Sequence, residues 1–296
     1  MAAELYKEDI MGKKKLKNPN TKIGPFNVIN AIIFIILAFI IIIPMWKIIV
    51  DSLDLTTSYG MRLFPAKFGF DGYKEVFSKS SLYRPLLISV ITTLAGTLIA
   101  LTLSTMGAYV LIQWKMPGRT LFANLLLFTM IFNGGMIPTY LVLSDLGLVN
   151  TLWVVILFPA LNVYNLVLMR NFFEGIPTSL FESAELDGCS PMQTFIKIVL
   201  PMSKAALASI GLMFAVTYWN DYTHYKLYIN NSLLYNFQMK LRDMVMGSDI
   251  PLSTSLANEN TIRNAAIIVA IIPFMILYPC LQKYFVKGVN IGAVKE

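Results

Sequence analysis

The sequence predicts an all-α, polytopic membrane protein with six transmembrane helices. Of its 296 residues, 56% are hydrophobic and only 14% are charged, and the mean hydropathy is +0.63. Charged residues make up about a quarter of a typical soluble domain, so the composition excludes an ordinary soluble fold. Apolar runs of about eighteen residues or more recur along the chain, and this length crosses about 30 Å of hydrocarbon.

The chain is expected to divide into a cytoplasmic N-terminal segment, residues 1–25, and a transmembrane domain, residues 26–296. The N-terminal segment is polar and basic, and an apolar run over residues 26–46 follows it. This run is too long for the hydrophobic region of a signal peptide, and no small-residue cleavage site follows it. We therefore expect it to be the first membrane span.

A mixed, charged loop over residues 47–84 is expected before the second span, residues 85–112. Small residues such as Gly96 and Ala100 favour close packing of this span against other helices. The third span is expected at residues 121–143, with an interruption at Asn133, Gly134, Gly135 and Pro138. The last three spans are expected at residues 148–169, 205–222 and 265–281.

Basic residues predict the orientation of the chain. The short loop at residues 112–120 holds two of them, whereas the short loop at residues 144–150 holds none. Because basic residues collect in cytoplasmic loops, both termini and the loop of residues 170–204 are expected in the cytoplasm. The loop of residues 223–264, which shows no strong periodicity, is expected outside. The net charge of +7 follows this pattern, and no basic stripe with interleaved aromatic residues indicates a nucleic-acid partner.

Within the loop of residues 170–204, the sequence predicts two short helices joined at a glycine. The hydroxyl groups of residues 178–179 are available to cap the first helix, and Glu182 is expected near its start, where it would suit the helix dipole. Gly188 is expected to end this helix, because glycine accepts the left-handed conformation that a C-terminal cap requires.

The second of these helices is expected to begin at Ser190. Pro191 suits its first turn, and Gln193 stands at the spacing of a capping box. Pro201 is expected to stop the helix. The helix pair would then project from the membrane on the side where positive charge collects.

The sequence offers little support for an enzyme. It contains no H-E-x-x-H, no G-x-S-x-G and no phosphate-binding G-x-x-x-x-G-K-[ST] pattern. His224 is the single histidine, whereas a zinc site needs several ligands at suitable spacing. We therefore expect no catalytic residue, no metal site and no cofactor in this chain.

An ion-coupled secondary solute carrier that works without an ATPase is the alternative function. Such carriers usually hold ionisable groups within their spans, but here the interior polar groups are amides, which cannot carry a proton. Amides can bind sugar hydroxyls or join helices, and aromatic rings can stack on sugars or lie at the membrane interface. The candidates for a substrate path are Asn133, Asn162, Asn165, Tyr218, Trp219, Asn220 and Tyr222.

The projecting helix pair carries a recognisable pattern. Glu182-Ser183-Ala184, three residues, Gly188, nine residues and residues 198–201 (Ile-Val-Leu-Pro) fit E-A-A-x3-G-x9-I-x-L-P, with a serine at the second position. The chain thereby resembles the membrane (permease) subunits of binding-protein-dependent ABC importers. Residues 132–140, 169–173 and 200–204 are similar to the carbohydrate branch, which is maltose-permease-like. They look closest to the subgroup that imports oligosaccharides of the alginate and pectin-fragment type.

This resemblance implies a type I ABC importer permease fold, a bacterial inner-membrane location and a defined set of partners. These partners are a second homologous permease, two ATPase subunits that bind ATP and Mg, an extracytoplasmic solute-binding protein and an oligosaccharide, with an acidic one such as alginate as a candidate. The loop of residues 170–204, called the coupling loop below, would fit a cleft of the ATPase. Its implied coupling residues are Glu182, Ser183, Ala184, Asp187, Gly188, Ile198, Leu200 and Pro201. In the outer loop, the residues implied in docking the binding protein are Tyr228, Tyr235, Lys240 and Arg242.

Overall fold

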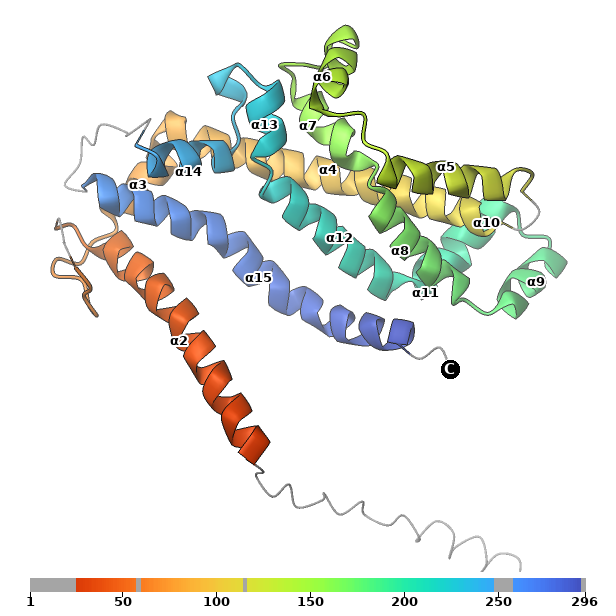
Figure 1. The fold of residues 1–296 in the computed structure, drawn as a ribbon, viewed down its shortest axis with the longest axis horizontal. Coiled ribbons are helices and arrows are strands. Elements are labelled where there is room, and N and C mark those ends of the chain that lie inside the picture. The colour runs from red at the N-terminus through yellow and green to blue at the C-terminus, as the bar shows by residue number, and fades with distance from the viewer. Residues whose placement is uncertain (1–24, 57–59, 114–115, 248–257, 294–296) are drawn as a thin grey trace, which may run out of the picture.

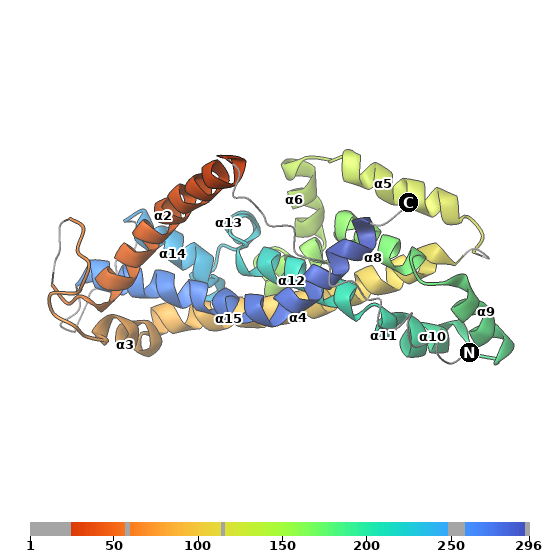
Figure 2. The ribbon, with the colours of Figure 1, turned by 90° about the horizontal axis from the view of Figure 1, so that it is seen from below.

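The computed structural model describes residues 25–56, 60–113, 116–247 and 258–293. These residues form an elongated helical bundle in which α12 lies between α4 and α15, while α2 diverges from the others (Figures 1 and 2). An isolated bridge between Asp54 and Phe68 is the only β pairing in the described residues. In chain order the helices are α2 (Pro25–Leu53), α3 (Asp71–Ser78), α4 (Ser80–Ile112), α5 (Arg119–Ile131), α6 (Met136–Asp145), α7 (Leu152–Leu157), η1 (Phe158–Ala160), α8 (Val163–Glu174), α9 (Thr178–Leu186), α10 (Pro191–Thr194), the π-helix η2 (Phe195–Val199), α11 (Leu200–Met202), α12 (Lys204–Trp219), α13 (Thr223–Tyr228), η3 (Ser232–Leu234), α14 (Phe237–Val245) and α15 (Glu259–Ala293).

The described residues contain enough apolar helix for the six predicted spans. Three helices are long and apolar enough to cross a membrane alone, namely α2, α4 and the part of α15 from Glu259 to Leu277. Three helix pairs qualify together, although a short break bends each pair. The pairs are α5 with α6, bent by 116°, Leu152–Ala160 with α8, bent by 44°, and Pro191–Met202 with α12, bent by 82°. Counting each pair as one span gives six.

The third predicted span is broken into α5 and α6. Gly135 has φ +91°, a conformation that interrupts a helix. The Gly135 N–H donates a hydrogen bond of 2.9 Å to the side-chain oxygen of Asn133. The interruption predicted at residues 133–135 is therefore confirmed, whereas Pro138 lies within the first turn of α6. A single straight axis across the interruption would be wrong, because the chain turns by 116° there.

The packing core lies between α4, α8 and α12. The ring of Tyr218 on α12 lies directly over Gly96 on α4, where an added Cβ atom would overlap the ring. The Tyr218 hydroxyl donates to the Ile156 carbonyl at 2.7 Å, so the ring has a fixed position. A Cβ atom added to Gly107 of α4 would likewise lie 2.9 Å from a side-chain carbon of Leu166 on α8. The predicted close packing of the second span is thus confirmed.

The loop predicted at residues 47–84 contains more helix than expected. α2 continues to Leu53, α3 follows, and α4 begins at Ser80 rather than at residue 85. Pro85 lies inside α4 instead of opening it. The polar turn before Pro85 joins the helix because Leu82 is buried against α14 and α15.

Asp54 organises the turn between α2 and α3. Its carboxylate accepts hydrogen bonds from the Thr56 N–H at 2.9 Å, the Thr56 hydroxyl at 2.7 Å, the Ala66 N–H at 3.0 Å and the Lys67 N–H at 3.2 Å. Burial acts to raise the pKa of the Asp54 carboxyl, but these hydrogen bonds outweigh it and lower the pKa to about 2. The carboxylate therefore holds the backbone of Ala66 and Lys67 next to the end of α2, where Asp54 and Phe68 form the antiparallel bridge.

The outer loop predicted at residues 223–264 is not irregular in its described part. It forms α13, η3 and α14, which pack on the body through their apolar faces. Asn236 caps α14 by accepting the Met239 N–H at 2.9 Å, and it also donates to the Asp221 carbonyl at 2.6 Å. Phe237, Leu241 and Met244 follow that cap on one helical face. The capping asparagine and the helical spacing of the apolar residues after it are the sequence signals that indicate α14.

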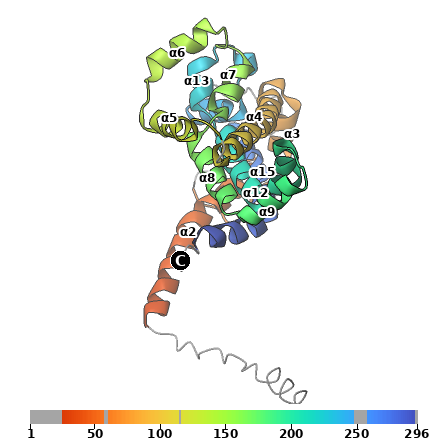
Figure 3. The same cartoon turned by 90° about the vertical axis from the view of Figure 1, so that its right-hand side faces the viewer.

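Two apolar helices, α2 and α5, leave most of their surface uncovered by the rest of the chain. The most apolar eighteen-residue window of α2 has no buried residue, and α5 has none over its whole length. Figure 3 shows α2 extending away from the packed core. Surfaces of this kind must be covered by lipid or by another subunit.

Candidate coupling site and translocation path

The first helix that lies wholly within the coupling loop is α9, which follows Pro177 without a side-chain cap. The prediction that residues 178–179 cap it is therefore wrong, because their hydroxyl groups lie inside the helix that Pro177 opens. Glu182 stands in the middle of α9, so it does not interact with the first turn as expected. Its side chain is exposed, whereas Ala184 on the other face is buried at 3% exposure.

Gly188 ends the first helix as predicted. It adopts φ +73°, and the chain reverses through hydrogen bonds from the Cys189 N–H to the Ala184 carbonyl at 2.9 Å and from the Asp187 N–H to the Ser183 carbonyl at 2.9 Å. Apart from its two neighbours in the chain, no described residue has an atom within 4 Å of a Cβ placed on Gly188. The glycine is thus required here by its backbone conformation, and its outer side is free.

The second helix begins with the predicted capping box. The Gln193 N–H donates to the Ser190 hydroxyl at 3.3 Å, and the Ser190 N–H donates to the Gln193 side chain at 2.9 Å. Pro191 occupies the first turn. Four backbone and side-chain groups are satisfied at once, which makes this the most constrained turn of the loop.

The second helix does not stop at Pro201. α10 passes into the wide π-turn η2 and then into α11, and the axis breaks only at Ser203, where it bends by 82° into α12. The Leu200 N–H reaches back to the Phe195 carbonyl, five residues earlier. Pro201 fits within α11 because a proline in the first turn of a helix needs no N–H partner. The predicted stop is therefore displaced by two residues.

The coupling loop is attached to the spans through its second half. Phe195 and Val199 are buried among residues of α4, α8 and α12. The Tyr109 hydroxyl of α4 donates to the Pro191 carbonyl at 2.8 Å, and the Tyr109 and Phe195 rings lie 4.8 Å apart between centroids. Sequence reasoning missed Tyr109, because nothing local marks a contact with a residue 82 positions away.

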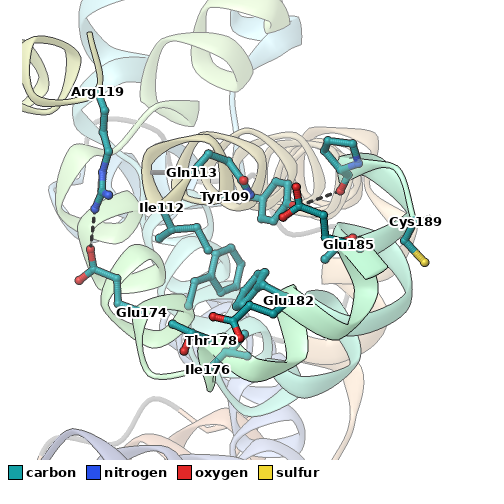
Figure 4. Close-up of a pocket in the computed structure, with 14 residues that line it drawn as sticks. Tyr109, Ile112, Gln113, Arg119, Glu174, Ile176, Thr178, Glu182, Glu185 and Cys189 are labelled. Carbon is teal, nitrogen blue, oxygen red and sulfur yellow. Dashed lines mark hydrogen bonds and ion pairs between the residues drawn. The ribbon is translucent and has the colours of Figure 1, made fainter. Parts of the chain in front are cut away.

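A pocket of about 650 Å³ lies between α9, α10 and the ends of α4 and α8. Figure 4 shows its lining, with the Tyr109 contact on one side and an ion pair between Arg119 and Glu174 on the other. That pair spans 3.5 Å, and Arg170 also holds Glu174, at 2.9 Å. Three carboxylates, those of Glu174, Glu182 and Glu185, line the pocket together with apolar side chains. The first half of the loop therefore does not pack flush against the spans.

The structure separates the residues predicted for a substrate path. Tyr218 and Trp219 are interior side chains, and the indole N–H of Trp219 donates to the Ala270 carbonyl at 3.1 Å. The prediction that they stack on sugar rings does not fit this arrangement, because helix packing covers their faces. Asn162 caps α8 by accepting the Asn165 N–H at 3.0 Å, and Asn165 is buried. Asn162 therefore has a capping role, and Asn165 belongs to the packed interior.

The other predicted path residues remain accessible. Asn133 is exposed at the break between α5 and α6. Asn220 is exposed at the end of α12, where its side-chain N–H donates to the Val216 carbonyl at 3.0 Å. Tyr222 is half-buried under Arg242, whose guanidinium carbon lies 4.3 Å from the ring centroid.

The predicted docking residues differ in exposure. Tyr228 is buried in a ring stack with Tyr140 and His224, and burial raises the pKa of its hydroxyl. Lys240 is buried as well, so neither side chain offers a surface to a binding protein in this arrangement. Tyr235 is half-buried and Arg242 is exposed.

The described residues contain no group of three or more His, Cys, Asp and Glu side chains that could hold a metal ion. His224 instead pairs with Asp221, its Nδ1 lying 2.9 Å from the nearer carboxylate oxygen. Its ring also meets Phe158 edge-on. The arrangement is that of a fixed structural pair.

These features define a class: a membrane-embedded transport subunit in which a polar helix pair extends from the apolar spans. Residues 23–291 match the family described as "Binding-protein-dependent transport system inner membrane component". The chain belongs to this family of multi-pass inner-membrane proteins. It is therefore a transport subunit and not an enzyme, and ATP hydrolysis takes place on separate subunits.

The chain is similar to two proteins of Bacillus subtilis over nearly its full length. It is 41% identical to the polygalacturonan/rhamnogalacturonan transport system permease protein YtcP of Bacillus subtilis (strain 168), over 87% of this chain and 94% of the relative. It is 40% identical to protein LplC of the same organism, over 93% of this chain and 97% of the relative.

A solved structure carries the same fold. It is that of a bacterial ABC transporter involved in the import of the acidic polysaccharide alginate, and one of its chains matches with a TM-score of 0.83 and 30% identity. The match covers 88% of this chain and 96% of the other. The predicted type I ABC importer permease fold is thereby confirmed, and nothing favours the ion-coupled carrier.

Proposed function

We propose that this permease forms half of a translocation path for an acidic oligosaccharide released from a polysaccharide. Two comparisons support this substrate class. The name of one relative specifies polygalacturonan and rhamnogalacturonan, and the matched structure belongs to an importer of the acidic polysaccharide alginate. Polygalacturonan and alginate are both polymers of uronic acids, so their fragments share carboxylate groups and pyranose rings.

The second subunit of the path is a homologous permease, and two ATPases and an extracytoplasmic binding protein complete the assembly. In this arrangement the coupling loop and both termini face the cytoplasm, and α13 and α14 face the binding protein. The uneven distribution of basic residues between the short loops supports the orientation. The exposed apolar faces of α2 and α5 supply surface for the second permease or for lipid.

The observation that carries the proposed coupling role is the two-faced structure of the coupling loop. Glu182, Ser183, Asp187 and Gly188 lie on its exposed side, where an ATPase cleft would receive them. Leu200 and the buried residues of the π-turn, Phe195 and Val199, lie on the side that packs against the spans. One side is thus available to a partner that hydrolyses ATP, and the other is bonded to the helices that must move.

For the substrate path, we propose the accessible members of the predicted set. Asn133 and Asn220 present amides that can bind sugar hydroxyls, and Tyr222 with Arg242 combines a ring with a positive charge that suits a uronate carboxylate. In the outer loop, Arg242 and Tyr235 are the side chains that remain available for docking.

The decisive experiment is uptake by the reconstituted assembly. The chain is copurified with its partner permease, ATPase and binding protein, placed in proteoliposomes and supplied with labelled trigalacturonate or a neutral trisaccharide. We expect uptake of the acidic sugar that requires internal ATP. Uptake by vesicles that hold this chain alone, driven by an ion gradient, would contradict the proposal. Preference for the neutral sugar would overturn the substrate class only.

A further inference from the structure

One contact joins the coupling loop to a span that is remote in sequence. Tyr109 lies near the end of α4 and is 8% exposed. Its hydroxyl donates to the Pro191 carbonyl at 2.8 Å, and its ring tilts by 36° against Phe195 at 4.8 Å. Both halves of the tyrosine, polar and apolar, are therefore engaged by the second coupling helix.

The contact is made with the stiffest turn of the loop. Pro191 has a ring-fixed backbone and lies inside the capping box of Ser190 and Gln193. A displacement of α10 therefore moves the Pro191 carbonyl as part of a rigid unit. Because the hydroxyl of Tyr109 is bonded to that carbonyl, the displacement is applied directly to α4.

The covalent route from the loop to α12 is less direct. Between α10 and α12 the chain passes through the π-turn η2, the short α11 and an 82° bend at Ser203. A bend that interrupts the helix can absorb a push as a change of angle. α4, by contrast, is one helix of 33 residues, and it reaches α12 again where Gly96 meets Tyr218.

The first half of the loop has room to move against α4. The pocket of about 650 Å³ separates α9 from the ends of α4 and α8. In Figure 4, Glu182 lies apart from Tyr109, whereas Glu185 reaches towards it. Motion of α10 acts on α4 directly, through the hydrogen bond between the Tyr109 hydroxyl and the Pro191 carbonyl.

We propose that Tyr109 is a positioning residue that transmits movement of the second coupling helix to α4. This inference rests on the proposed function, since it assigns a path for the same ATP-driven motion. The hydroxyl bond fixes the direction of the movement, and the Phe195 ring provides the surface that pushes. α4 then carries α12 with it through the Gly96–Tyr218 contact.

The first test uses Tyr109→Phe, which keeps the ring and removes the hydroxyl. In the full reconstituted assembly, we expect the number of sugars transported per ATP hydrolysed to fall about fivefold, as expected for the loss of one ordinary hydrogen bond from a two-state equilibrium. The KM for ATP should stay at the wild-type value, because no nucleotide contact changes. Tyr83→Phe on the exposed far end of the same helix is the matched control and should transport normally.

A spectroscopic readout separates transmission from a general loss of structure. In a background with Cys189→Ser and Cys280→Ser, a spin label at Leu87→Cys reports on α4 and one at Val216→Cys reports on α12; both side chains are exposed. We expect Tyr109→Phe to reduce the ATP-dependent change at residue 87 at least as much as that at residue 216. Unchanged signals together with a wild-type transport ratio would overturn the inference.

Phe195→Leu tests the same contact from the loop side and serves if Tyr109→Phe fails to assemble. It keeps an apolar side chain and loses the ring contact, so the transport ratio should fall while assembly persists. A normal ratio in Phe195→Leu would then refute the role of this contact. Failure of the proposed function is distinguishable, because it appears as absent ATP-driven uptake in the wild-type assembly.

Discussion

The ring of Tyr218 lies against Gly96 so closely that a Cβ atom on the glycine would overlap the ring. The ring cannot withdraw, because its hydroxyl is bonded to the Ile156 carbonyl and its side chain is only 2% exposed. Three helices, α4, α7 and α12, thus meet at one tyrosine. The closeness of α4 and α12 depends on the absence of a single side-chain carbon.

Gly96→Ala should therefore destabilise the protein by about 2 kcal/mol through overpacking, even though alanine favours helices more than glycine does. Gly211→Ala in α12 is the control, because a Cβ there would lie 3.5 Å from Leu101, an ordinary contact. It should leave stability unchanged or raise it slightly. Thermal unfolding of the two purified variants in detergent measures the difference, and equal midpoints would contradict the packing described.

Gly188→Asp should leave the protein in the membrane but uncouple ATP hydrolysis from uptake. The aspartate must adopt φ +73°, which costs about 1 kcal/mol, and it adds a charge on the side of the turn offered to the ATPase. Gly147→Asp carries the same backbone strain, at φ +68° with open surroundings, but lies in a different loop. Sugar uptake and ATPase rates are compared in the two variants. Wild-type transport in Gly188→Asp, or equal loss in both, would exclude the coupling role of this turn.

Asp54 should give the protein an acid-sensitive stability. The pKa of its carboxyl is about 2 when folded and 3.8 in the reference state, so the unfolded chain binds the proton more tightly. The stabilisation is complete above about pH 4 and is lost as the pH falls towards 2. Asp54→Asn should lower the unfolding temperature at pH 7 and flatten the pH dependence in this window. Asp71→Asn, at a more exposed aspartate, should do neither.

The N-termini of α9 and α10 should respond differently to alanine substitution. Ser190→Ala removes a side-chain cap and should destabilise α10 by about 1 kcal/mol. Thr178→Ala should have little effect, because Thr178 makes no capping hydrogen bond. Hydrogen exchange over residues 178–199 reports both changes locally. Faster exchange after Thr178→Ala than after Ser190→Ala would show that the caps are assigned to the wrong helix.

Local chemistry predicted the parts of this protein that depend on neighbouring residues. Hydropathy located the six apolar regions, Gly188 predicted its own left-handed turn, and the Ser190–Gln193 spacing predicted the capping box. Each of these features is complete within a few residues. The family pattern from Glu182 to Pro201 is local in the same sense.

Contacts between distant residues were not predictable in this way. Tyr109 reaches Pro191 across 82 positions, and Asp54 binds Ala66 and Lys67 through backbone groups that carry no sequence signal. From the sequence, Tyr218 and Trp219 are candidates for stacking on sugar and equally for the membrane interface, because aromatic residues at a span end look alike whether buried or exposed. Only the packing of α4 and α15 around them decides the matter.

The break at residues 132–135 has a consequence for the isolated chain in a bilayer. Its backbone leaves the helical hydrogen-bond pattern in the middle of an apolar region, and the side chains of Phe132, Asn133 and Met136 are exposed. Lipid tails cannot bond the amide groups released there, so such a segment exists in a membrane only against protein or water. Before its partner arrives, the single subunit would hydrate this point and perturb the lipids around it. Assembly of the transporter would then also shield this hydrated backbone from the lipid.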